Sequence, residues 1–273
     1  MAEFESTRFD RADDDYAPPD ATSRERLRIE EAGRNALSTR HQLFYDGWLL
    51  RLSPGKAKRG RSVNPHFGSS LPLDAKIAHC ERLYASRGLP TLFRITPFAK
   101  PSDLDAALDA RGYTVYEPTL VEIAREVTLP SLAGGDDVDV SAVSVDAFVD
   151  ACATLRGSPP GHRAAHLERL AHSPFAMHAV VVRRDGLALA CGQVTLDDDL
   201  AAIYDMVTAP AARGRGLATR IVRELLQWAR QQGATRAFLQ VNEDNAPARA
   251  VYRKFGFVTS YAYPYRARPA QCA

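Results

Sequence analysis

The hydrophobic and polar positions of this chain follow two periods, one helical and one strictly alternating, which replace each other repeatedly along the sequence. Apolar residues at helical spacing predict helices over residues 25–37, 73–87, 104–109, 147–155, 163–170, 215–231 and 246–255. Short apolar or alternating runs predict strands over residues 42–52, 62–67, 92–95, 113–125, 178–183, 187–196, 201–208, 237–241 and 258–265. Interleaved helices and strands predict an α/β fold.

Polar and turn-rich stretches divide the chain into three parts. Residues 1–24 contain few side chains that can build a core, so we expect a disordered tail. Residues 130–138 are rich in Pro, Gly and Asp and predict a linker. The linker separates a first unit, residues 25–129, from a second unit, residues 130–273.

The two units also end in a similar way. The segment ALDARGYTVYEPTLV (residues 107–121) parallels VYRKFGFVTSYAYPY (residues 251–265). Each contains a short helix, a Gly-aromatic pair and a strand. We interpret the similarity as a diverged internal repeat, with coincidence as the alternative.

Composition and charge exclude several classes of protein. Of the 273 residues, 45% are hydrophobic and 25% charged, as in ordinary globular proteins, and the formal net charge of +2 gives no footprint for nucleic acid. No apolar run reaches the ~18 residues of a membrane-spanning helix. The acidic N-terminus lacks the apolar stretch of a signal peptide, and the four cysteines are isolated. We therefore expect a cytoplasmic protein with reduced thiols and no membrane partner.

A glycine-rich sequence, RGRGLA (residues 213–218), lies between the predicted strand 201–208 and the long helix that follows. Glycines allow close approach of a ligand, and the unpaired N–H groups at a helix start attract anions. Arg213 and Arg215 add positive charge. The sequence therefore predicts a phosphate or pyrophosphate site.

Two well-known phosphate-binding loops fit this sequence poorly. A P-loop requires Gly-Lys-Ser/Thr, whereas Leu217 and Ala218 follow the second glycine. The dinucleotide fingerprint requires a third small residue where Thr219 stands, although Glu243 lies near the position of its acidic partner. A nucleotide-dependent oxidoreductase therefore remains as a third alternative.

Two longer blocks carry a more specific signal. VTAPAARGRGLATRIV (residues 207–222) and FLQVNEDNAPARAVYRKFGF (residues 238–257) resemble the pyrophosphate loop and the following strand and helix of the GNAT superfamily of N-acetyltransferases. The resemblance covers residues 180–266 and departs from the family pattern at Ala211, where Gln or Arg is usual. It implies a mixed central sheet flanked by helices, in two tandem units of which the first is a degenerate copy.

The resemblance also implies acetyl-CoA as the cosubstrate. The pyrophosphate would bind to the backbone N–H groups of Arg213, Gly214, Arg215, Gly216, Leu217 and Ala218. The pantetheine arm would follow the strand backbone at Met206, Val207 and Thr208, where the thioester carbonyl would be polarised. Asn245 would contact the pantetheine, cap the helix that begins beside Pro247, or do both.

Acyl transfer to an amine requires an acid for the leaving thiolate and a base for the amine proton. The resemblance assigns the acid to Tyr252, for which a core aromatic is the alternative. Asp205 and Glu243 are candidates for the base, directly or through water. Either one is also explained as a solvated carboxylate at a strand end, and the sequence does not decide between them.

The predicted function is transfer of an acetyl group from acetyl-CoA to a primary amine of a small molecule by direct attack. The alternatives are a peptide or protein N-acetyltransferase and a non-catalytic, CoA-binding regulatory module. A compact acceptor site would favour the small molecule. The first unit has FGSSLPLD (residues 67–74) where a glycine loop would be, so we expect it to bind no CoA and to shape the acceptor site.

Three further features remain open at this stage. The basic run Lys56, Lys58, Arg59 and Arg61 would meet the CoA 3′-phosphate, an acidic acceptor or only water, and a solvated loop is the interpretation we favour. His162 and His166 lie one helical turn apart without an evident third ligand, so no metal is expected. Closed dimers are the commonest oligomers in general, so a homodimer is one possible assembly, but the sequence itself does not decide the oligomeric state.

Overall fold

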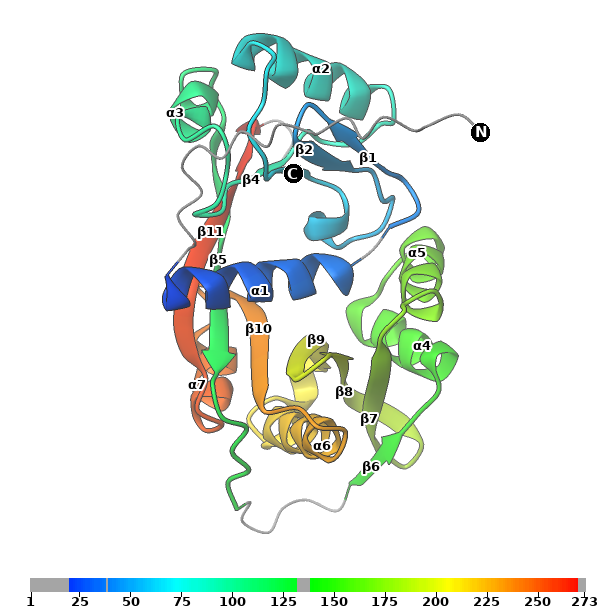
Figure 1. Cartoon of the computed structure of the whole chain (residues 1–273). Helices are drawn as coiled ribbons and strands as arrows, with labels where there is room; N and C mark the ends of the chain where they lie inside the picture. The colour runs from blue at the N-terminus through cyan, green and yellow to red at the C-terminus, as the bar shows by residue number, and fades with distance from the viewer. Residues whose placement is uncertain (1–19, 38, 132–137, 270–273) are drawn as a thin grey trace, which may run out of the picture.

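The computed structural model describes residues 20–37, 39–131 and 138–269 (Figure 1). The first half contains α1 (Ala21–Asn35), β1 (Gln42–Tyr45), β2 (Trp48–Arg51), the 3-10 turn η1 (Lys58–Gly60), β3 (Val63–Pro65), α2 (Leu73–Ala85), β4 (Phe93–Arg94), α3 (Leu104–Asp109) and β5 (Thr114–Ala124). The predicted strand over residues 42–52 is a hairpin, because Asp46 and Gly47 adopt φ angles of 43° and 83° and reverse the chain.

Helix α1 begins four residues earlier than the pattern predicted. Asp20 caps it by accepting the N–H of Ser23 at 2.7 Å. Residues 21–24, which were predicted to belong to a disordered tail, are therefore helical. Residues 1–19 of that tail lie outside the described residues.

The second half contains β6 (Asp139–Ala142), α4 (Val145–Arg156), α5 (Pro160–Ala171), β7 (Ala176–Arg184), β8 (Leu187–Asp197), β9 (Leu200–Thr208), the 3-10 turn η2 (Pro210–Ala212), α6 (Leu217–Gln231), β10 (Arg236–Asn242), α7 (Ala246–Arg253) and β11 (Val258–Ala267). Strand β6 was not predicted, because its four residues include only one large apolar side chain. It pairs with β7 at one end of the sheet. Most of the predicted linker, residues 132–137, lies outside the described residues.

In the described residues, eleven strands form one sheet in the order β1-β2-β3-β4-β11-β5-β10-β9-β8-β7-β6. The pairs β3/β4 and β9/β10 are parallel, and the other neighbours are antiparallel. Each parallel pair is joined by a crossover helix, α2 or α6. The predicted fold class, an α/β fold with a mixed sheet flanked by helices, is confirmed.

Strand β5 connects the two halves of the sheet. It comes from the first half of the sequence, yet it lies between β10 and β11 and pairs with both. Val121, for example, is opposite Gln240 on one side and Tyr261 on the other. Strand β11 in turn pairs with β4. The halves therefore share a single hydrogen-bonded sheet.

Helices cover both faces of this sheet (Figure 1). On one side, here called the α6 face, Ile221 of α6 packs in one apolar cluster with Val180 of β7 and Tyr252 of α7. On the other side, the α1 face, helices α1, α4 and α5 pack in two clusters, one of which contains Val181. Neighbouring residues of a strand thus point to opposite faces, as the pleat requires.

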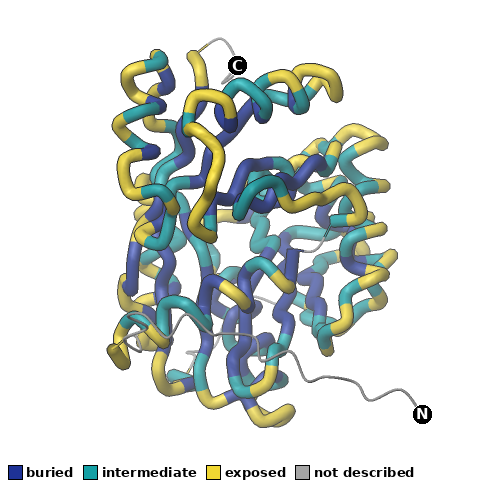
Figure 2. The backbone as a smooth tube through the Cα atoms, turned by 45° about the horizontal axis from the view of Figure 1, so that its top comes forward, coloured by how far each residue is buried: buried dark blue, intermediate teal, exposed yellow. Residues whose placement is uncertain are grey.

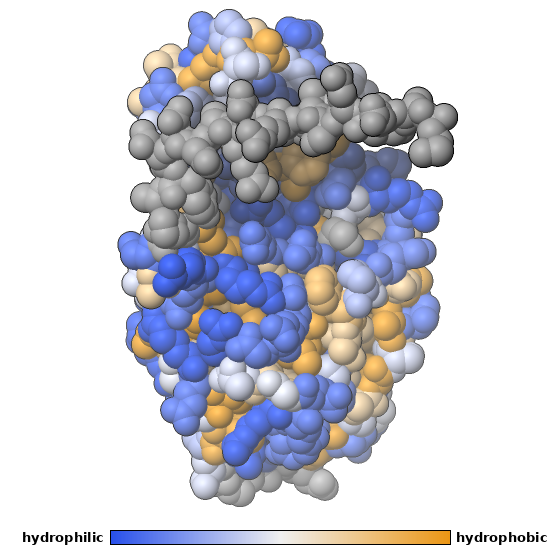
Figure 3. Space-filling model, viewed as in Figure 1, coloured by the Kyte–Doolittle hydropathy of each residue, from blue (hydrophilic) through white to orange (hydrophobic). Residues whose placement is uncertain are grey.

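The sheet strands are mostly buried, whereas the loops and the outer sides of the helices are exposed (Figure 2). Helix α1 presents a hydrophilic outer side (Figure 3), consistent with its amphipathic sequence. Its inner side approaches β10 closely at Gly33, where a Cβ atom would lie 3.0 Å from the Gln240 side chain. Among the described helices, none is both long and apolar enough to cross a membrane.

Candidate active site

Strands β9 and β10 diverge in the middle of the sheet. They pair from Leu200 opposite Arg236 to Ile203 opposite Leu239. Beyond these residues β9 continues beside β8, and β10 continues beside β5. Within the described residues, the backbone of 204–208 is therefore unpaired on its β10 side, and it includes the predicted pantetheine-binding residues Met206, Val207 and Thr208.

A bulge in β9 marks the point where the strands diverge. Gln193 is opposite Tyr204 and Cys191 is opposite Val207, so Asp205 and Met206 share the single partner position of Gly192. Asp205 adopts a φ of 54° there. As a result, the consecutive side chains of Tyr204 and Asp205 both contact residues on the α1 face. Regular alternation would have placed them on opposite faces.

The predicted pyrophosphate loop lies at the end of β9 and leads into α6. Gly214 and Gly216 both have φ angles of 76°, which glycine adopts without strain. A Cβ atom at either glycine would meet nothing within 4 Å, so the space beside the loop is open. Gly216 is the N-cap of α6 and provides no side-chain cap. The first N–H groups of the helix are thus available to an anion.

Asn245 and Tyr252 lie on α7. The side chain of Asn245 caps the helix by accepting the N–H of Ala248 at 3.3 Å, in agreement with one of its two predicted roles. Tyr252 is buried on the α6 face, beside Phe257. Burial, and then the charge of Glu122, raises the pKa of Tyr252 to about 12. The phenol therefore carries its proton at neutral pH, as a proton donor must.

Asp205 belongs to a dense ionic network. It accepts hydrogen bonds from Arg169 at 2.9 Å, Arg156 at 3.2 Å and Gln193 at 3.2 Å, and it lies 3.1 Å from Nε2 of His166. Burial opposes the charge, but the nearby Arg169 and His166 hold the pKa of Asp205 well below its usual range. Burial likewise disfavours a charged His166, yet the bond with Asp205 raises the pKa of this imidazole.

The three predicted catalytic residues do not form one cluster. Tyr252 packs on the α6 face, whereas the Asp205 side chain contacts α4 and α5 on the α1 face. Glu243 follows β10 directly, is exposed, and is held through its backbone N–H, which donates to Pro118 at 2.9 Å. Tyr252 and Asp205 therefore lie on opposite sides of the diverging strands.

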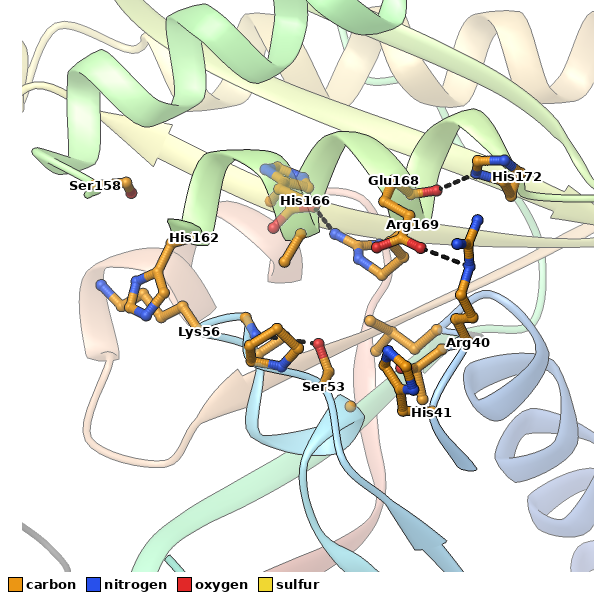
Figure 4. A pocket seen from close by; sticks show the side chains of 18 of the residues that line it. Arg40, His41, Ser53, Lys56, Ser158, His162, His166, Glu168, Arg169 and His172 are labelled. Carbon is orange, nitrogen blue, oxygen red and sulfur yellow. Dashed lines mark hydrogen bonds and ion pairs between the residues drawn. The ribbon is translucent and has the colours of Figure 1, made fainter. Parts of the chain in front are cut away.

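A cavity of about 330 Å³ lies beside Asp205 on the α1 face. Figure 4 shows α5 on one side of it, with His162, His166 and Arg169, and the segment around Ser53 and Lys56 on the other. The residues that line it thus come from both halves of the chain. A volume of this size suits a small molecule.

Sequence reasoning missed a buried polar cluster next to this cavity. Glu30 of α1 pairs with Arg94 of β4 at 3.0 Å and accepts the Tyr261 hydroxyl at 2.8 Å. Arg59, from the predicted solvated basic run, is half-buried and lies 5.2 Å from the ring centre of Tyr204. The basic run was the one sequence feature that pointed to this cluster. It could not reveal the other members of the cluster, because they lie far from Arg59 in the sequence.

Comparison with known proteins identifies the family. The model of the acetyltransferase (GNAT) family matches residues 148–257. An uncharacterized N-acetyltransferase of Bacillus subtilis (strain 168), YobR, is 31% identical over 229 residues, covering 80% of this chain and 89% of that protein. The chain therefore belongs to the GNAT acetyltransferase family, as its sequence motifs predicted, and its enzyme class is that of the acyltransferases.

Solved structures show the same fold. A GCN5-related N-acetyltransferase from Kribbella flavida superposes with a TM-score of 0.66 at 18% identity, over 93% of this chain and 97% of that one. A tandem GNAT protein from the clavulanic acid biosynthesis pathway superposes with a TM-score of 0.53 at 14% identity, over 71% of this chain and 68% of that one. Both likenesses concern the fold alone.

Proposed function

We propose that the protein transfers an acetyl group from acetyl-CoA to a primary amine of a small molecule. The observation that carries this proposal is the divergence of β9 and β10 beside an open, glycine-containing loop at the start of α6. In this proposal residues 130–273 form the acetyl-CoA-binding unit. Residues 25–129 form a degenerate unit that binds no CoA and supplies part of the acceptor site.

The residues present fit the cosubstrate. The backbone N–H groups of residues 214–218 would hold the pyrophosphate, because both glycines leave open space and the helix start is uncapped by side chains. The predicted contribution of Arg213 requires a rearrangement, since its N–H donates to the carbonyl of Pro210 at 3.3 Å. The backbone of Met206, Val207 and Thr208 would bind the pantetheine arm, since it is unpaired on its β10 side within the described residues. The bound thioester supplies an activated acetyl group to the amine.

Tyr252 is the proposed acid. Its raised pKa of about 12 keeps a proton available for the departing sulfur, and the hydroxyl belongs to the α6 face, which also carries the cosubstrate loop. The alternative role as a core aromatic is compatible with its burial. Only a measurement of turnover separates the two roles.

We assign proton removal from the amine to Glu243, acting through water, because this carboxylate is exposed at the end of β10. Asp205 is a weak proton acceptor because its pKa lies well below the usual range. It instead positions His166 and two arginines beside the cavity. Glu243→Gln should lower turnover at neutral pH and recover activity at high pH, where the amine is already deprotonated. Equal loss at every pH would remove Glu243 from this role.

The cavity of about 330 Å³ favours a small-molecule acceptor over a peptide, since both halves of the chain contribute to its wall. The first experiment is calorimetric titration with acetyl-CoA, with NADH as a control, followed by a screen of amines for release of free CoA thiol. Micromolar binding at one site per chain with thiol release supports the proposal. Binding without any transfer would favour the regulatory module, and binding of NADH alone would overturn the assignment.

A further inference from the structure

An excess of positive charge is buried on the α1 face, next to the diverging strands. Among the described residues, four arginines and a single carboxylate, Glu30, surround a cavity of about 10 Å³ that also touches Gln240 of β10. The arginines are Arg34, Arg51, Arg59 and Arg94. The whole chain carries a formal charge of only +2, so this region holds more net positive charge than the protein as a whole.

Glu30 neutralises only part of this charge. Its carboxylate is shared by Arg94 at 3.0 Å and Arg34 at 3.2 Å. Arg51 instead donates to neutral acceptors, the carbonyl of Arg34 at 2.9 Å and the amide oxygen of Gln42 at 3.2 Å. Burial, reinforced by Arg34 and Arg94, lowers the pKa of Arg51 to about 10. The site thus has a strong positive potential.

Several buried polar groups in this region lack partners within the described part of the chain, Nε of Arg94 among them. Two others lie close together. They are Nη1 of Arg59 and the hydroxyl of Tyr204, and both atoms are buried. The Tyr204 side chain is 5% exposed and lies under the Arg59 guanidinium. Because leaving a buried donor unsatisfied costs about 1–3 kcal/mol, both groups are able to bind a ligand atom or a water molecule.

The larger cavity next to Arg59 has no unpaired carboxylate for a cationic ligand among its described residues. Gly60, which follows the arginine, and Ala57, two residues before it, line that cavity together with Lys56. It has two carboxylates, and both are already paired: Glu168 with Arg40 at 2.9 Å, and Asp205 with its two arginines. An acceptor with several positive charges would find no free counter-ion among the described lining residues.

We propose that the acceptor is an amine that also carries an anionic group, a carboxylate or a phosphate, bound by Arg59 and the Tyr204 hydroxyl. This inference rests on the proposed acetyltransferase function and specifies its substrate. The planar guanidinium is suited to two-pronged binding of either anion. The same positive potential would disfavour the ammonium form of the acceptor and so favour the free amine that attacks.

The binding test uses the full chain with CoA present in excess, so that the loop at residues 213–218 is occupied. Titration with inorganic phosphate and with acetate should show saturable binding of at least one ion. In Arg59→Ala the Kd should rise by about tenfold to a hundredfold, the effect of losing one charged hydrogen-bond donor. Arg87→Ala removes an exposed arginine at the end of α2 and should leave the Kd unchanged.

Tyr204→Phe provides a second variant, and it should fold like the wild type. It should weaken anion binding without lowering the temperature of unfolding, because the hydroxyl has no partner to lose within the described residues. The proposal is overturned if neither ion binds to the wild type, or if Arg59→Ala and Tyr204→Phe bind as tightly as the wild type. Because this test needs no catalysis, it stands even if the proposed function fails.

The activity test compares acceptors in matched pairs, measured by thiol release. Alanine is set against alaninamide, and O-phosphoethanolamine against ethanolamine, so that each pair differs by the anionic group. We expect kcat/KM to be at least about tenfold higher for the anionic member of one pair, and that pair identifies carboxylate or phosphate. Equal rates within both pairs would overturn the inference while leaving the acetyltransferase function intact.

Discussion

Two strand–helix–strand units of this protein have the same topology but differ in what faces the backbone N–H groups before their helix. Both β3–α2–β4 and β9–α6–β10 join parallel neighbours by a crossover helix. Before α6, the N-cap Gly216 offers no side chain to the helix, and the space beside it is open. Before α2, the corresponding backbone N–H groups are already occupied by a side chain of the protein itself.

That side chain is Asp46, from the turn of the β1–β2 hairpin. Its carboxylate accepts the N–H groups of Ser70 at 3.0 Å and Leu71 at 2.9 Å, and it pairs with Lys76 of α2 at 3.1 Å. These backbone hydrogen bonds hold the pKa of Asp46 well below its usual range. An internal anion therefore sits where, in the second unit, we place the pyrophosphate.

The comparison shows that one backbone arrangement can serve either structure or binding, depending on which anion fills it. In the first unit the anion is covalently part of the chain, so the site is permanently closed and anchors the hairpin. In the second unit the glycines leave open space at the corresponding position. This difference supports our proposal that only residues 130–273 bind acetyl-CoA.

The largest expected effect comes from removing the glycines of the open loop. In a Gly214→Val/Gly216→Val double variant, two residues at φ 76° would be strained by about 1–2 kcal/mol each, which predicts a loss of about a hundredfold in acetyl-CoA affinity by calorimetry. Gly88→Val is the matched control, because Gly88 has a φ of 63° and equally open space, but follows α2 in the first unit. If the double variant retained its affinity, the loop would not be the cosubstrate site.

The next effect concerns the helices that follow the two strand–helix–strand units, α3 after β4 and α7 after β10. Tyr252→Phe should lower turnover by about tenfold to a hundredfold while leaving acetyl-CoA affinity unchanged, because only the transferable proton is lost. In the parallel segment of the first unit, Leu108 stands in place of Tyr252, so that unit has no such proton. Tyr45→Phe, in strand β1, serves as the control and should retain full turnover. Normal turnover in Tyr252→Phe would reduce this residue to a core aromatic.

A smaller effect is expected at the internal anion. Asp46→Asn should lower the midpoint of thermal unfolding at neutral pH, since Lys76 is buried and would lose its charged partner. Because the folded-state pKa of Asp46 is depressed, its contribution is present above the unfolded value of about 3.9 and is lost as the pH falls below it. The difference between variant and wild type should therefore shrink below about pH 4. A constant difference at all pH values would argue against this anion–helix contact.

The smallest effect is at the cap of α7. Asn245→Ala removes the hydrogen bond to the N–H of Ala248 and should cost about 1 kcal/mol of stability in a denaturant titration. If Asn245 also contacts the pantetheine, acetyl-CoA affinity will fall beyond what this loss explains. Asn245→Asp, which preserves the cap, separates the two roles.

The sequence predicted local features well, because they depend on neighbouring residues. Helix α3 has its predicted bounds, and the glycine-rich sequence indicated the loop before α6. The predicted helix start at residue 215 was two residues too early, because Gly216 has a φ of 76° and α6 begins at Leu217. The bulge at Asp205 was not predictable, since it arises from the pairing of β9 with β8 and from the absence of a side chain at Gly192. That bulge places Tyr204 and Asp205 on one face.

The buried cluster was beyond sequence reasoning for a similar reason. Glu30 contacts Arg94, 64 residues away, and Tyr261, 231 residues away. The local pattern of the helix over residues 25–37 gives no indication of these partners. Interactions of this kind depend on the order of the strands, which no local period encodes.

The position of β5 has a consequence for folding of the chain during its synthesis on the ribosome. This strand is synthesised more than a hundred residues before β10 and β11, the two strands that hold it. Until β10 and β11 have been synthesised, both edges of β5 lack their native partners. During that time the strand is accessible to chaperones and to pairing with other chains. We expect a gene cut between residues 129 and 130 to yield two insoluble fragments, and co-expression of both fragments to restore a soluble protein.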